Sequence, residues 1–404
     1  MKQSHKIAIL GFGREGKSVL QFLKKSPSYK GAEITILDAA RNKNYLKGLE
    51  KYDIIFRSPG VPYLLPEIQT AVKHGCHVTS ATKLFFSLCP GKIIGITGTK
   101  GKGTTSTMLY EILRGAGKKV VLAGNIGTPM LDVLPRVTKS TLVILELSSF
   151  QLQDLEVSPA IAAIVEMFPD HLDVHKNMQE YVTAKTNIAC HQNSSDAVFY
   201  FSADPIAKKM ASNSKGKKIA VTAPDDLRKN FIIAGAIARH LGCSARTIEE
   251  ARITYRNLPY RLELVRTVGK MRFYNDSAST NPQTAAAAIA SVTNDKQPIV
   301  LIAGGKDKNL DYKPLAAAIK KSKYVVEIIL IGENKNKIQK AVGASTPIQI
   351  AHTLQEAVTM AYETLQIYKS GAVLFSPAAA SFDMFKDYED RGRQFTKIVK
   401  RMKS

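Results

Sequence analysis

The feature that most constrains this chain is the glycine-rich stretch Gly95–Ser106, with the sequence GITGTKGKGTTS. The apolar run Lys92–Thr97 at its start predicts a buried strand, and Met108–Leu113 beyond it has helical spacing. The glycines between them let backbone N–H groups approach a phosphate closely, and Lys102 can reach the outer phosphates of a nucleotide. We therefore predict a strand, a phosphate loop and a helix that bind a nucleotide. A tight turn without a ligand is the alternative.

The strict phosphate-loop pattern G-x-x-x-x-G-K-[ST] is not met in this stretch. Ile96 stands where the first glycine is expected, and Gly103 stands where the Mg²⁺-binding hydroxyl is expected. Thr104 or Thr105 would therefore have to supply that hydroxyl.

The length and the apolar runs indicate a multidomain protein without a membrane span. The 404 residues, 45% of them hydrophobic, are enough for two or three domains, each with its own core. The longest apolar runs, such as Ile299–Ala303, have the length of a strand, far short of the roughly 20 residues that cross a bilayer. Lys6–Leu10 predicts a strand entering a turn rather than a secretory signal. We therefore expect a cytoplasmic protein.

The cysteines and the net charge further limit which bonds and partners we expect. The four cysteines lie far apart, without a C-x-x-C or zinc-binding spacing, so we expect free thiols. Lys and Arg outnumber Asp and Glu by 57 to 34, which gives a net charge of +23. Because this excess is scattered and no RNA- or DNA-binding motif accompanies it, we expect some attraction for phosphorylated substrates rather than a nucleic-acid partner. Nothing in the sequence indicates more than a monomer.

The first ninety residues alternate strand and helix patterns, which predicts a parallel sheet. Gly11–Gly16, with the sequence GFGREG, follows the first expected strand, and Asp38 ends the second, as in a dinucleotide-binding fingerprint. The expected strands are Lys6–Leu10, Glu33–Leu37 and Asp53–Phe56. An NAD-dependent oxidoreductase is one interpretation. However, no His/Lys pair for hydride transfer follows in an interpretable place, and another diphosphate fits the turn equally well.

The central segment follows a predicted linker at Leu88–Gly91. Its strand Leu142–Glu146 ends in a carboxylate. A carboxylate at the C-terminal end of a parallel strand beside a phosphate loop is where a nucleotide's Mg²⁺ is usually held, although helix capping is an alternative role. The loop Asp170–Asp173, with the sequence DHLD, leads to a helix that carries Lys185. Taken alone, a loop with one histidine and two aspartates is more often a capping and solvation cluster than a metal site.

The last segment follows a second predicted linker at Asn257–Arg261 and again alternates strands and helices, which predicts a third sheet. Three polar turns each follow a strand, at the edge where open α/β sheets bind ligands: Asn275–Ser277, Gly304–Lys308 and Ser376–Ser381. The expected strands are Val268–Tyr274, Ile299–Ala303, Val325–Ile331 and Ala372–Phe375, and helices are expected near Ala285–Ala290, near Leu354–Ile367 and at the C-terminus.

In this order, the motifs resemble those of the ATP-dependent Mur ligases over all three segments. The phosphate loop and Asp170-His171 are similar to Mur ligases in general. Glu146–Leu152 (ELSSFQL), Gly124–Pro129 (GNIGTP) and Ser376–Gly392 resemble the members that add D-glutamate to UDP-N-acetylmuramoyl-L-alanine in peptidoglycan precursor synthesis. The Asp-Asn-Pro-Arg motif of the diaminopimelate- or lysine-adding member is absent.

The resemblance implies an α/β protein of three domains. These are a Rossmann-like UDP-sugar-binding domain at residues 1–90, a central P-loop ATP-binding domain with a mostly parallel sheet at 91–258, and a Rossmann-like amino-acid-binding domain at 259–404.

The resemblance also implies site residues. The implied ATP site consists of Gly98, Thr99, Lys100, Gly101, Lys102, Gly103, Thr104, Thr105, Asn230, Arg261, Asn275 and Asp276. The implied Mg²⁺ ligands or orienting groups are Thr104, Glu146, His171 and Lys185, where Lys185 matches a lysine that is carbamylated in the family. The implied UDP-sugar site consists of Gly13, Arg14, Asp38, Ser58, Asn125, Ser148 and Gln151, and the implied D-glutamate site of Lys308, Ser381 and Tyr388. Lys102, Lys185, His171 and Arg261 are the implied catalytic set.

The implied reaction starts with attack of the substrate's alanyl carboxylate on the γ-phosphate of ATP. The amine of glutamate then displaces phosphate from the resulting acyl phosphate, so no protein nucleophile is needed. Several residues depart from the family pattern: Gly103 replaces a hydroxyl residue, Ala278 a common lysine, Ile233 a common adenine-contacting asparagine, and Tyr388 a phenylalanine. Two alternatives stay open: a related ligase for another amino acid, of the L-glutamate or folylpolyglutamate type, and a nucleotide-binding module that has lost catalysis.

Overall fold

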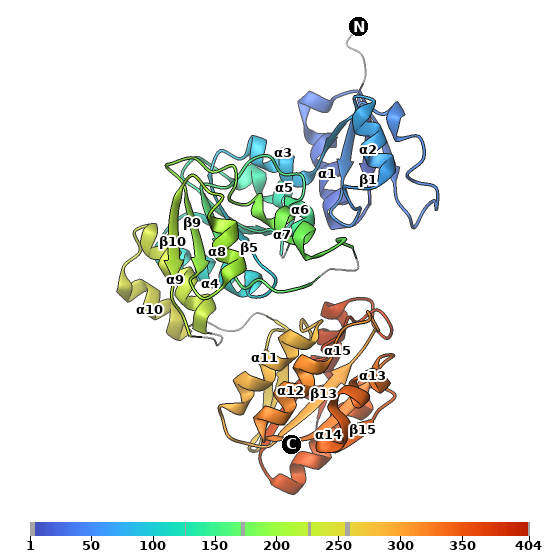
Figure 1. Ribbon diagram of the computed structural model, residues 1–404, viewed down its shortest axis with the longest axis vertical. Coiled ribbons are helices and arrows are strands. Elements are labelled where there is room, and N and C mark those ends of the chain that lie inside the picture. The colour runs from blue at the N-terminus through green and yellow to red at the C-terminus, as the bar shows by residue number, and fades with distance from the viewer. Residues whose placement is uncertain (1–4, 126, 171–173, 225–227, 255–258, 403–404) are drawn as a thin grey trace. The chain divides into compact units, whose positions relative to one another are not determined.

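The computed structural model describes residues 5–125, 127–170, 174–224, 228–254 and 259–402. The chain forms two compact units, Met1–Tyr255 and Arg256–Ser404, and each is described by itself (Figure 1). Unit 1 contains an N-terminal sheet of four strands and a central sheet of six, and unit 2 contains a C-terminal sheet of six. The predicted α/β class is confirmed. In the described part of the chain, no helix is both long and apolar enough to cross a membrane.

The N-terminal sheet is parallel, with the strand order β2-β1-β3-β4. Its strands are β1 (Lys6–Leu10), β2 (Glu33–Leu37), β3 (Ile54–Arg57) and β4 (His77–Thr79), and its helices are α1 (Arg14–Lys25), α2 (Pro66–Lys73) and α3 (Ala81–Leu88). Alternate residues of β1 pack into different cores, Ile7 and Ile9 into one and Ala8 and Leu10 into another. Both faces of β1 are therefore buried, which explains its continuous apolar sequence.

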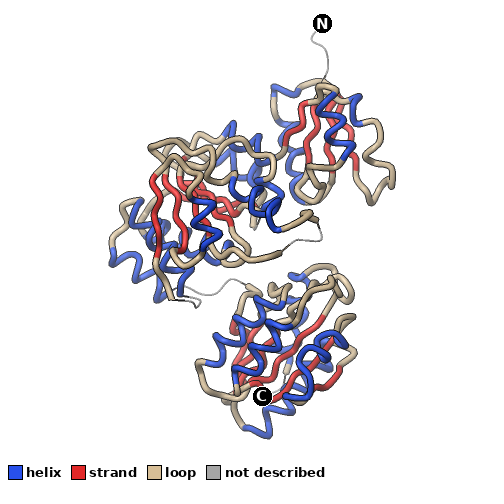
Figure 2. Tube along the Cα trace, in the orientation of Figure 1, coloured by secondary structure: helices blue, strands red, loops and turns tan. Residues whose placement is uncertain are grey.

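The central sheet is also parallel, with the order β10-β9-β8-β5-β7-β6. Its strands are β5 (Lys92–Thr97), β6 (Val120–Gly124), β7 (Leu142–Glu146), β8 (Ile161–Ile164), β9 (Ala197–Phe201) and β10 (Lys217–Val221). Its helices are α4 (Lys102–Gly115), α5 (Met130–Val133), α6 (Ser149–Leu152), α7 (Met178–Thr186), α8 (Pro205–Ala211), α9 (Arg228–His240) and α10 (Ala245–Thr254). Figure 2 shows the helices on both sides of the strands. The strand before the phosphate loop therefore lies in the middle of the sheet, with β7 on one side and β8 on the other.

The C-terminal sheet has the order β11-β12-β16-β13-β14-β15, in which β11 joins antiparallel and the others are parallel. Its strands are β11 (Glu263–Val268), β12 (Met271–Asn275), β13 (Ile299–Gly304), β14 (Val325–Ile331), β15 (Ile348–Ile350) and β16 (Gly371–Phe375). Its helices are α11 (Pro282–Thr293), α12 (Lys313–Ser322), α13 (Lys335–Val342), α14 (Leu354–Tyr368) and α15 (Tyr388–Arg401). The carboxyl ends of β13 and β16 lie side by side, where the chain direction across the sheet reverses. In open α/β sheets this is a ligand-binding position.

One strand prediction is wrong. Val268–Tyr274 was expected to form a single strand, but Val268 ends β11 and Met271 begins β12, its antiparallel partner. Gly269 lies between them with a φ of 58°, a left-handed conformation that lets the chain reverse. Apolar residues occur on both sides of this turn because both strands of the hairpin contribute side chains, such as Val268 and Phe273, to one core. The domain limits at residues 90 and 258 stay predictions.

Candidate active site

The phosphate-loop sequence joins a buried strand directly to a helix. β5 is buried from Ile93 to Thr97, and α4 begins at Lys102. Gly98 and Gly101 have φ values of 148° and 87°, which suit glycine. A Cβ at position 98 would lie 2.5 Å from Val165 Cγ2, so only glycine fits against the neighbouring strand end. The turn therefore exposes backbone N–H groups at the positive end of a helix, which favours an anion.

Two lysines converge on one carbonyl of this loop. Lys102 Nζ donates hydrogen bonds to the carbonyl oxygens of Gly98 and Thr99, both at 3.0 Å. Lys185, on α7, is 2% exposed, and its Nζ donates to the same Gly98 oxygen at 3.0 Å and to Thr97 Oγ1 at 3.3 Å. The structure thus brings together two predicted residues that lie 83 positions apart in the sequence.

The environment of Lys185 favours its neutral amine. Burial, and next the positive charge of Lys102, hold the pKa of the Lys185 amine well below its usual value, although Asp170 and Glu146 act in the opposite direction. Tyr181 lies one helical turn earlier, with its ring centroid 4.9 Å from Lys185 Nζ. Burial also raises the pKa of the Tyr181 hydroxyl, which therefore stays protonated.

Glu146 ends β7 beside the phosphate loop and is 2% exposed. Its Oε1 accepts a hydrogen bond from Asn125 Nδ2 at 2.7 Å, whereas its Oε2 is buried and has no hydrogen-bond partner among the described residues. A buried carboxylate oxygen without a partner is unfavourable unless a cation or another donor satisfies it. The residues present therefore fit a hard cation such as Mg²⁺, which prefers oxygen ligands.

The structure describes fewer of the other implied Mg²⁺ ligands. His171 lies outside the described residues. Within the described ranges, no group of three or more His, Cys, Asp or Glu side chains could hold a metal. A cation beside Glu146 would therefore take most of its ligands from phosphate oxygens and water, as Mg²⁺ commonly does.

Thr104 and Thr105, the two candidates for the Mg²⁺-binding hydroxyl, differ in burial and in hydrogen bonding. Thr105 is buried, and its hydroxyl donates to Asn230 Oδ1 at 3.2 Å, whereas Thr104 is half-buried, with its hydroxyl unpaired in the described structure. Asn230 also packs against the loop, because a Cβ at Gly101 would lie 2.3 Å from its Oδ1. Ile233 lies fully buried in the core between α9 and the sheet, which explains why an apolar residue replaces asparagine there. Thr104 is therefore the better placed hydroxyl for a metal.

A cavity of about 400 Å³ lies at the carboxyl ends of β1, β3 and β6. Five of the implied UDP-sugar residues line it: Gly13, Arg14, Asp38, Ser58 and Asn125. The carboxylate of Asp38 accepts hydrogen bonds from the Phe12 and Ala40 amides, which lower its pKa. Ser58 Oγ donates to the Gly11 carbonyl at 2.7 Å, so this hydroxyl helps close the glycine-rich turn.

Ser148 and Gln151, the other two implied UDP-sugar residues, form the start of α6. The Ser148 hydroxyl accepts a hydrogen bond from the Gln151 amide, and Gln151 Oε1 accepts one from the Ser148 amide, which is a capping box. Gln151 Nε2 donates to Glu15 Oε1 at 2.5 Å. This contact ties α6 to α1, which borders the cavity.

Three residues in this region were not found by sequence reasoning: Glu15, Arg57 and His175. Glu15 lies in the GFGREG turn and lines the cavity. Arg57 is 2% exposed and pairs with Asp154 at 2.7 Å, 97 positions away. The sequence did contain a signal for Arg57, a charged residue that ends the apolar run of β3, and one for His175, a second histidine four positions after His171. Neither signal shows which residue the side chain contacts.

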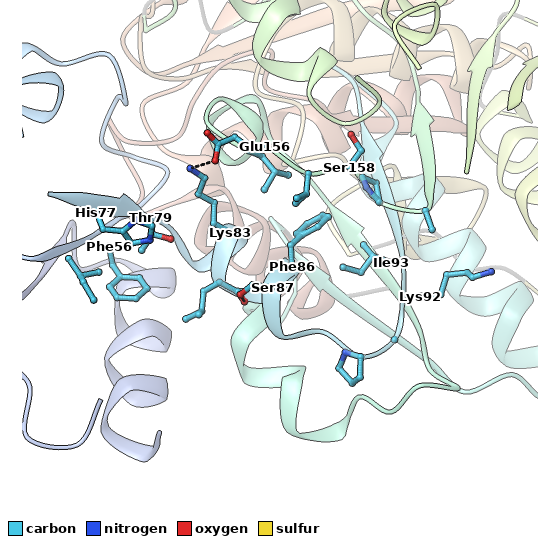
Figure 3. A pocket seen from close by; sticks show the side chains of 18 of the residues that line it. Phe56, His77, Thr79, Lys83, Phe86, Ser87, Lys92, Ile93, Glu156 and Ser158 are labelled. Atoms are coloured by element: carbon cyan, nitrogen blue, oxygen red, sulfur yellow. Dashed lines mark hydrogen bonds and ion pairs between the residues drawn. The ribbon is translucent and has the colours of Figure 1, made fainter. Parts of the chain in front are cut away.

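A second cavity, of about 880 Å³, lies at the amino ends of β3, β4, β5 and β8, away from the phosphate loop. Figure 3 shows Phe56 and Phe86 on its walls and Lys83 reaching Glu156, an ion pair of 3.3 Å. None of the implied site residues lines it.

In unit 2, the two polar turns after β13 and β16 meet. The Lys306 amide donates to the Ala380 carbonyl at 2.9 Å. Lys308 is exposed, with its Nζ 6.0 Å from the ring centroid of Phe382, and Ser381 is buried between the turns. Tyr388 begins α15, and its hydroxyl donates to Glu389 at 3.3 Å. Lys308 and Ser381 thus lie at one edge of the sheet.

Asn275 ends β12 beside the end of β16 and Asp276 follows it, whereas Arg261 lies shortly before β11. Asn275 Nδ2 donates to the Gly392 carbonyl and to Thr396, and Asp276 accepts hydrogen bonds from the Leu262 amide and the Ser376 hydroxyl. Both side chains therefore hold unit 2 together. Arg261 is half-exposed and forms no ion pair with the described residues.

Comparisons with known proteins identify the family of the chain. Residues 96–279 match the Mur ligase middle domain, and residues 260–379 match the Mur ligase glutamate ligase domain. The UDP-N-acetylmuramoylalanine–D-glutamate ligase of Acetivibrio thermocellus is 34% identical over 98% of this chain and 96% of its own, and that of Symbiobacterium thermophilum is 31% identical over 99% and 98%.

Solved structures show the same fold. The MurF ligase of Thermotoga maritima in complex with ADP has a TM-score of 0.63 at 14% identity, covering 99% of this chain and 97% of its own. The UDP-N-acetylmuramate–alanine ligase MurC from the same organism has a TM-score of 0.62 at 17% identity, covering 99% and 100%. The chain belongs to the Mur ligase family, in the group of the UDP-N-acetylmuramoylalanine–D-glutamate ligases.

Proposed function

We propose that this protein is an ATP-dependent acid–amino-acid ligase that joins D-glutamate to UDP-N-acetylmuramoyl-L-alanine. One observation carries the proposal most directly: Lys102 and Lys185 converge on the Gly98 carbonyl, beside the unpaired carboxylate oxygen of Glu146. A protein that only bound a nucleotide would not need a buried amine and an unsatisfied carboxylate beside its phosphate loop. The full-length similarity to D-glutamate ligases favours this reaction over that of a folate-type or NAD-dependent enzyme.

The first chemical step is attack of the alanyl carboxylate oxygen on the γ-phosphorus of ATP, with ADP as the leaving group. The loop amides and the Lys102 ammonium stabilise the negative charge of the phosphates. When bound, Mg²⁺ supplies additional neutralisation of the phosphate charge. Glu146 and Thr104 would hold it, together with His171.

In the second step, the amine nitrogen of D-glutamate attacks the acyl carbon, the C–O bond to phosphate breaks, and the amine proton is lost. We assign recognition of the amino acid to Lys308, Ser381 and Tyr388. The Lys308 ammonium can pair with a carboxylate of glutamate, because it is exposed at the ligand-binding edge of the sheet.

Lys185 can act as a carbamate. A neutral amine can attack dissolved CO₂ and lose a proton to form an N-carboxylate, which replaces a cation with an anion. Burial and the nearby charge of Lys102 lower the pKa of Lys185, which increases the share of neutral amine that can react with CO₂. An anionic carbamate there would attract the Lys102 ammonium.

We assign the sugar nucleotide to the cavity of about 400 Å³, with its diphosphate at the Gly11–Gly16 turn. The N-terminus of α1 provides positive potential at that turn. Asn125 and Ser148 lie beyond it, towards Glu146. We propose that the protein acts as a monomer in the cytoplasm.

The test is release of ADP and phosphate from ATP and Mg²⁺ in the presence of UDP-N-acetylmuramoyl-L-alanine. Separate reactions contain D-glutamate, L-glutamate, L-lysine or no amino acid. We expect turnover that needs both substrates and prefers D-glutamate. A preference for L-glutamate would keep the reaction and overturn the assignment of the amino acid. Folded, ATP-binding protein without turnover would instead favour a module that has lost catalysis.

A further inference from the structure

A chain of three polar side chains, two of them buried and one partly exposed, joins α6 to α7. His175 Nε2 lies 2.9 Å from Ser149 Oγ, and His175 Nδ1 lies 3.1 Å from Glu180 Oε1. Ser149 and His175 are each 2% exposed. Neither residue lines the cavities described above, so this Ser–His–Glu arrangement is not open to a substrate as a hydrolase triad would be.

The hydrogen bonds define one arrangement of the neutral imidazole. A carboxylate only accepts hydrogen bonds, so Glu180 requires the proton on Nδ1. Nε2 is then an acceptor, and the Ser149 hydroxyl donates to it. The ring also stacks on Phe150, with a centroid distance of 5.0 Å and an interplanar angle of 6°, and meets Tyr181 edge-on at 5.4 Å. Residues of both helices therefore hold the His175 ring, through hydrogen bonds to its two nitrogens and through ring contacts with Phe150 and Tyr181.

The two helices carry different parts of the site. Ser148 and Gln151 on α6 belong to the proposed sugar-nucleotide site. Tyr181 and Lys185 on α7 contact the phosphate loop, Tyr181 through a hydrogen bond of 3.1 Å to Thr99 Oγ1 and Lys185 through the Gly98 carbonyl. His175 lies between these two sets.

We propose that His175 is a positioning residue that sets the start of α6 relative to the phosphate loop. In this way it fixes the distance from the bound alanyl carboxylate to the γ-phosphate. The inference rests on the proposed function, because it assumes that Ser148 holds the sugar nucleotide. Bound reactants lose much of their rate advantage when misplaced by about 1 Å, so a loose α6 would slow the first step.

A second link between the same helices provides a matched control. Asn187, just after α7, donates from Nδ2 to the Leu152 carbonyl at the end of α6, at 2.8 Å. His175 instead holds Ser149, next to Ser148. Loss of Asn187 should therefore loosen the helix pair without moving the sugar-nucleotide contact.

The experiment compares His175→Phe, which keeps a flat ring for stacking but loses both hydrogen bonds, with Asn187→Ala. For His175→Phe we expect about tenfold weaker binding of UDP-N-acetylmuramoyl-L-alanine by calorimetry and about tenfold lower kcat. The KM for ATP should change less than about twofold, since the phosphate loop keeps its own contacts. For Asn187→Ala we expect a lower Tm with unchanged sugar-nucleotide affinity.

A double-mutant cycle with Ser148→Ala shows whether His175 acts through α6. If it does, His175→Phe should weaken binding less than about twofold in the Ser148→Ala background, because the contact that it positions is already lost. Equal losses in both backgrounds would overturn the proposal. Equal losses of affinity in His175→Phe and Asn187→Ala would also overturn it, because the role would then be general stability.

Amide hydrogen exchange separates this proposal from the proposed function. If the wild-type protein bound no sugar nucleotide, the proposed function would fail, and exchange at residues 148–152 would still report on His175. Faster exchange there in His175→Phe than in Asn187→Ala supports the positioning role. Equal exchange overturns it.

Discussion

Two glycine-rich turns of this protein can be compared directly. The turn Gly98–Gly101 follows β5 in unit 1, and the turn Gly304–Lys308 follows β13 in unit 2. Both strands are buried and lie between two parallel neighbours, and both turns contain glycines with positive φ. A predicted functional lysine directly follows the first turn, Lys102, and another ends the second, Lys308.

The two turns lead into different structure. After Gly101 the chain enters the 14-residue helix α4 at once, whereas after Lys308 it runs on to Lys313 before α12 begins. Lys102 is held by carbonyls of its own turn, while Lys308 is exposed over Phe382. The first turn therefore offers backbone amides and a helix N-terminus, which suit phosphate. The second offers side chains, which suit selection of an amino acid.

The largest expected effect comes from the first turn. Lys102→Ala should lower turnover at least about 1,000-fold, because it removes a positive charge that stabilises the transferred phosphoryl group. Binding of the sugar nucleotide, measured by calorimetry, should survive, since its cavity is lined by other residues. Retained turnover would show that the loop is not the phosphate site. The contrast between a phosphate-binding turn and an amino-acid-binding turn would then be wrong.

The second turn should give a more selective effect. Lys308→Ala should raise the KM for D-glutamate about 10- to 100-fold, the range expected for one hydrogen bond to a charged group. The KM for ATP should stay unchanged in steady-state assays. The control is Lys306→Ala, two residues away, because Lys306 already pairs with Glu333 at 2.6 Å. Equal effects of the two substitutions would contradict a specific role for Lys308.

The smallest effect concerns a third glycine-rich turn, Gly11–Gly16, where Glu15 has a buried Oε2 without a partner among the described residues. Burial raises the pKa of Glu15 above its ordinary value of 4.5, so the folded state binds this proton more tightly than the unfolded state. The stability gained from the proton is present at low pH and is lost as pH rises through the folded pKa. Glu15→Gln should therefore raise the free energy of unfolding at pH 8 by about 1 kcal/mol, with little change at pH 4.

Urea unfolding at both pH values measures this effect. Glu33→Gln is the control, because Glu33 is exposed on β2. A gain of the same size in both variants, or a gain for Glu15→Gln that does not depend on pH, would show that the Glu15 carboxylate is not strained by burial.

Sequence reasoning predicted the local parts of this fold well. Apolar runs predicted β1, β5, β7 and β14, because parallel strands buried on both faces have continuous apolar sequences. The hairpin of β11 and β12 was missed, since its turn interrupts an apolar run by only two residues, Gly269 and Lys270. Local pattern cannot distinguish such a turn from a longer strand.

The position of Lys102 directly after the glycine-rich turn and that of Glu146 at the end of a strand could be predicted, because both follow from local sequence pattern. Lys185 came only from family resemblance, because no local pattern shows that its helix packs under the phosphate loop. Arg57 and His175 were missed, since their partners are distant in the sequence or belong to another element. The inward positions of Asn275 and Asp276 were also hidden, because a polar side chain beside a turn can face either a ligand or its own backbone.

The buried pair of Arg57 and Asp154 has a consequence for synthesis of the chain. Arg57 leaves the ribosome 97 residues before Asp154 and 93 before Phe150, whose carbonyl accepts another of its hydrogen bonds. At typical translation speeds, that interval is on the order of 5 to 20 s. During that time β1 to β4 can pair while the guanidinium of Arg57 stays in water, because burying it alone would be costly. The N-terminal sheet of the nascent chain therefore cannot bury Arg57 until β7 and α6 have left the ribosome.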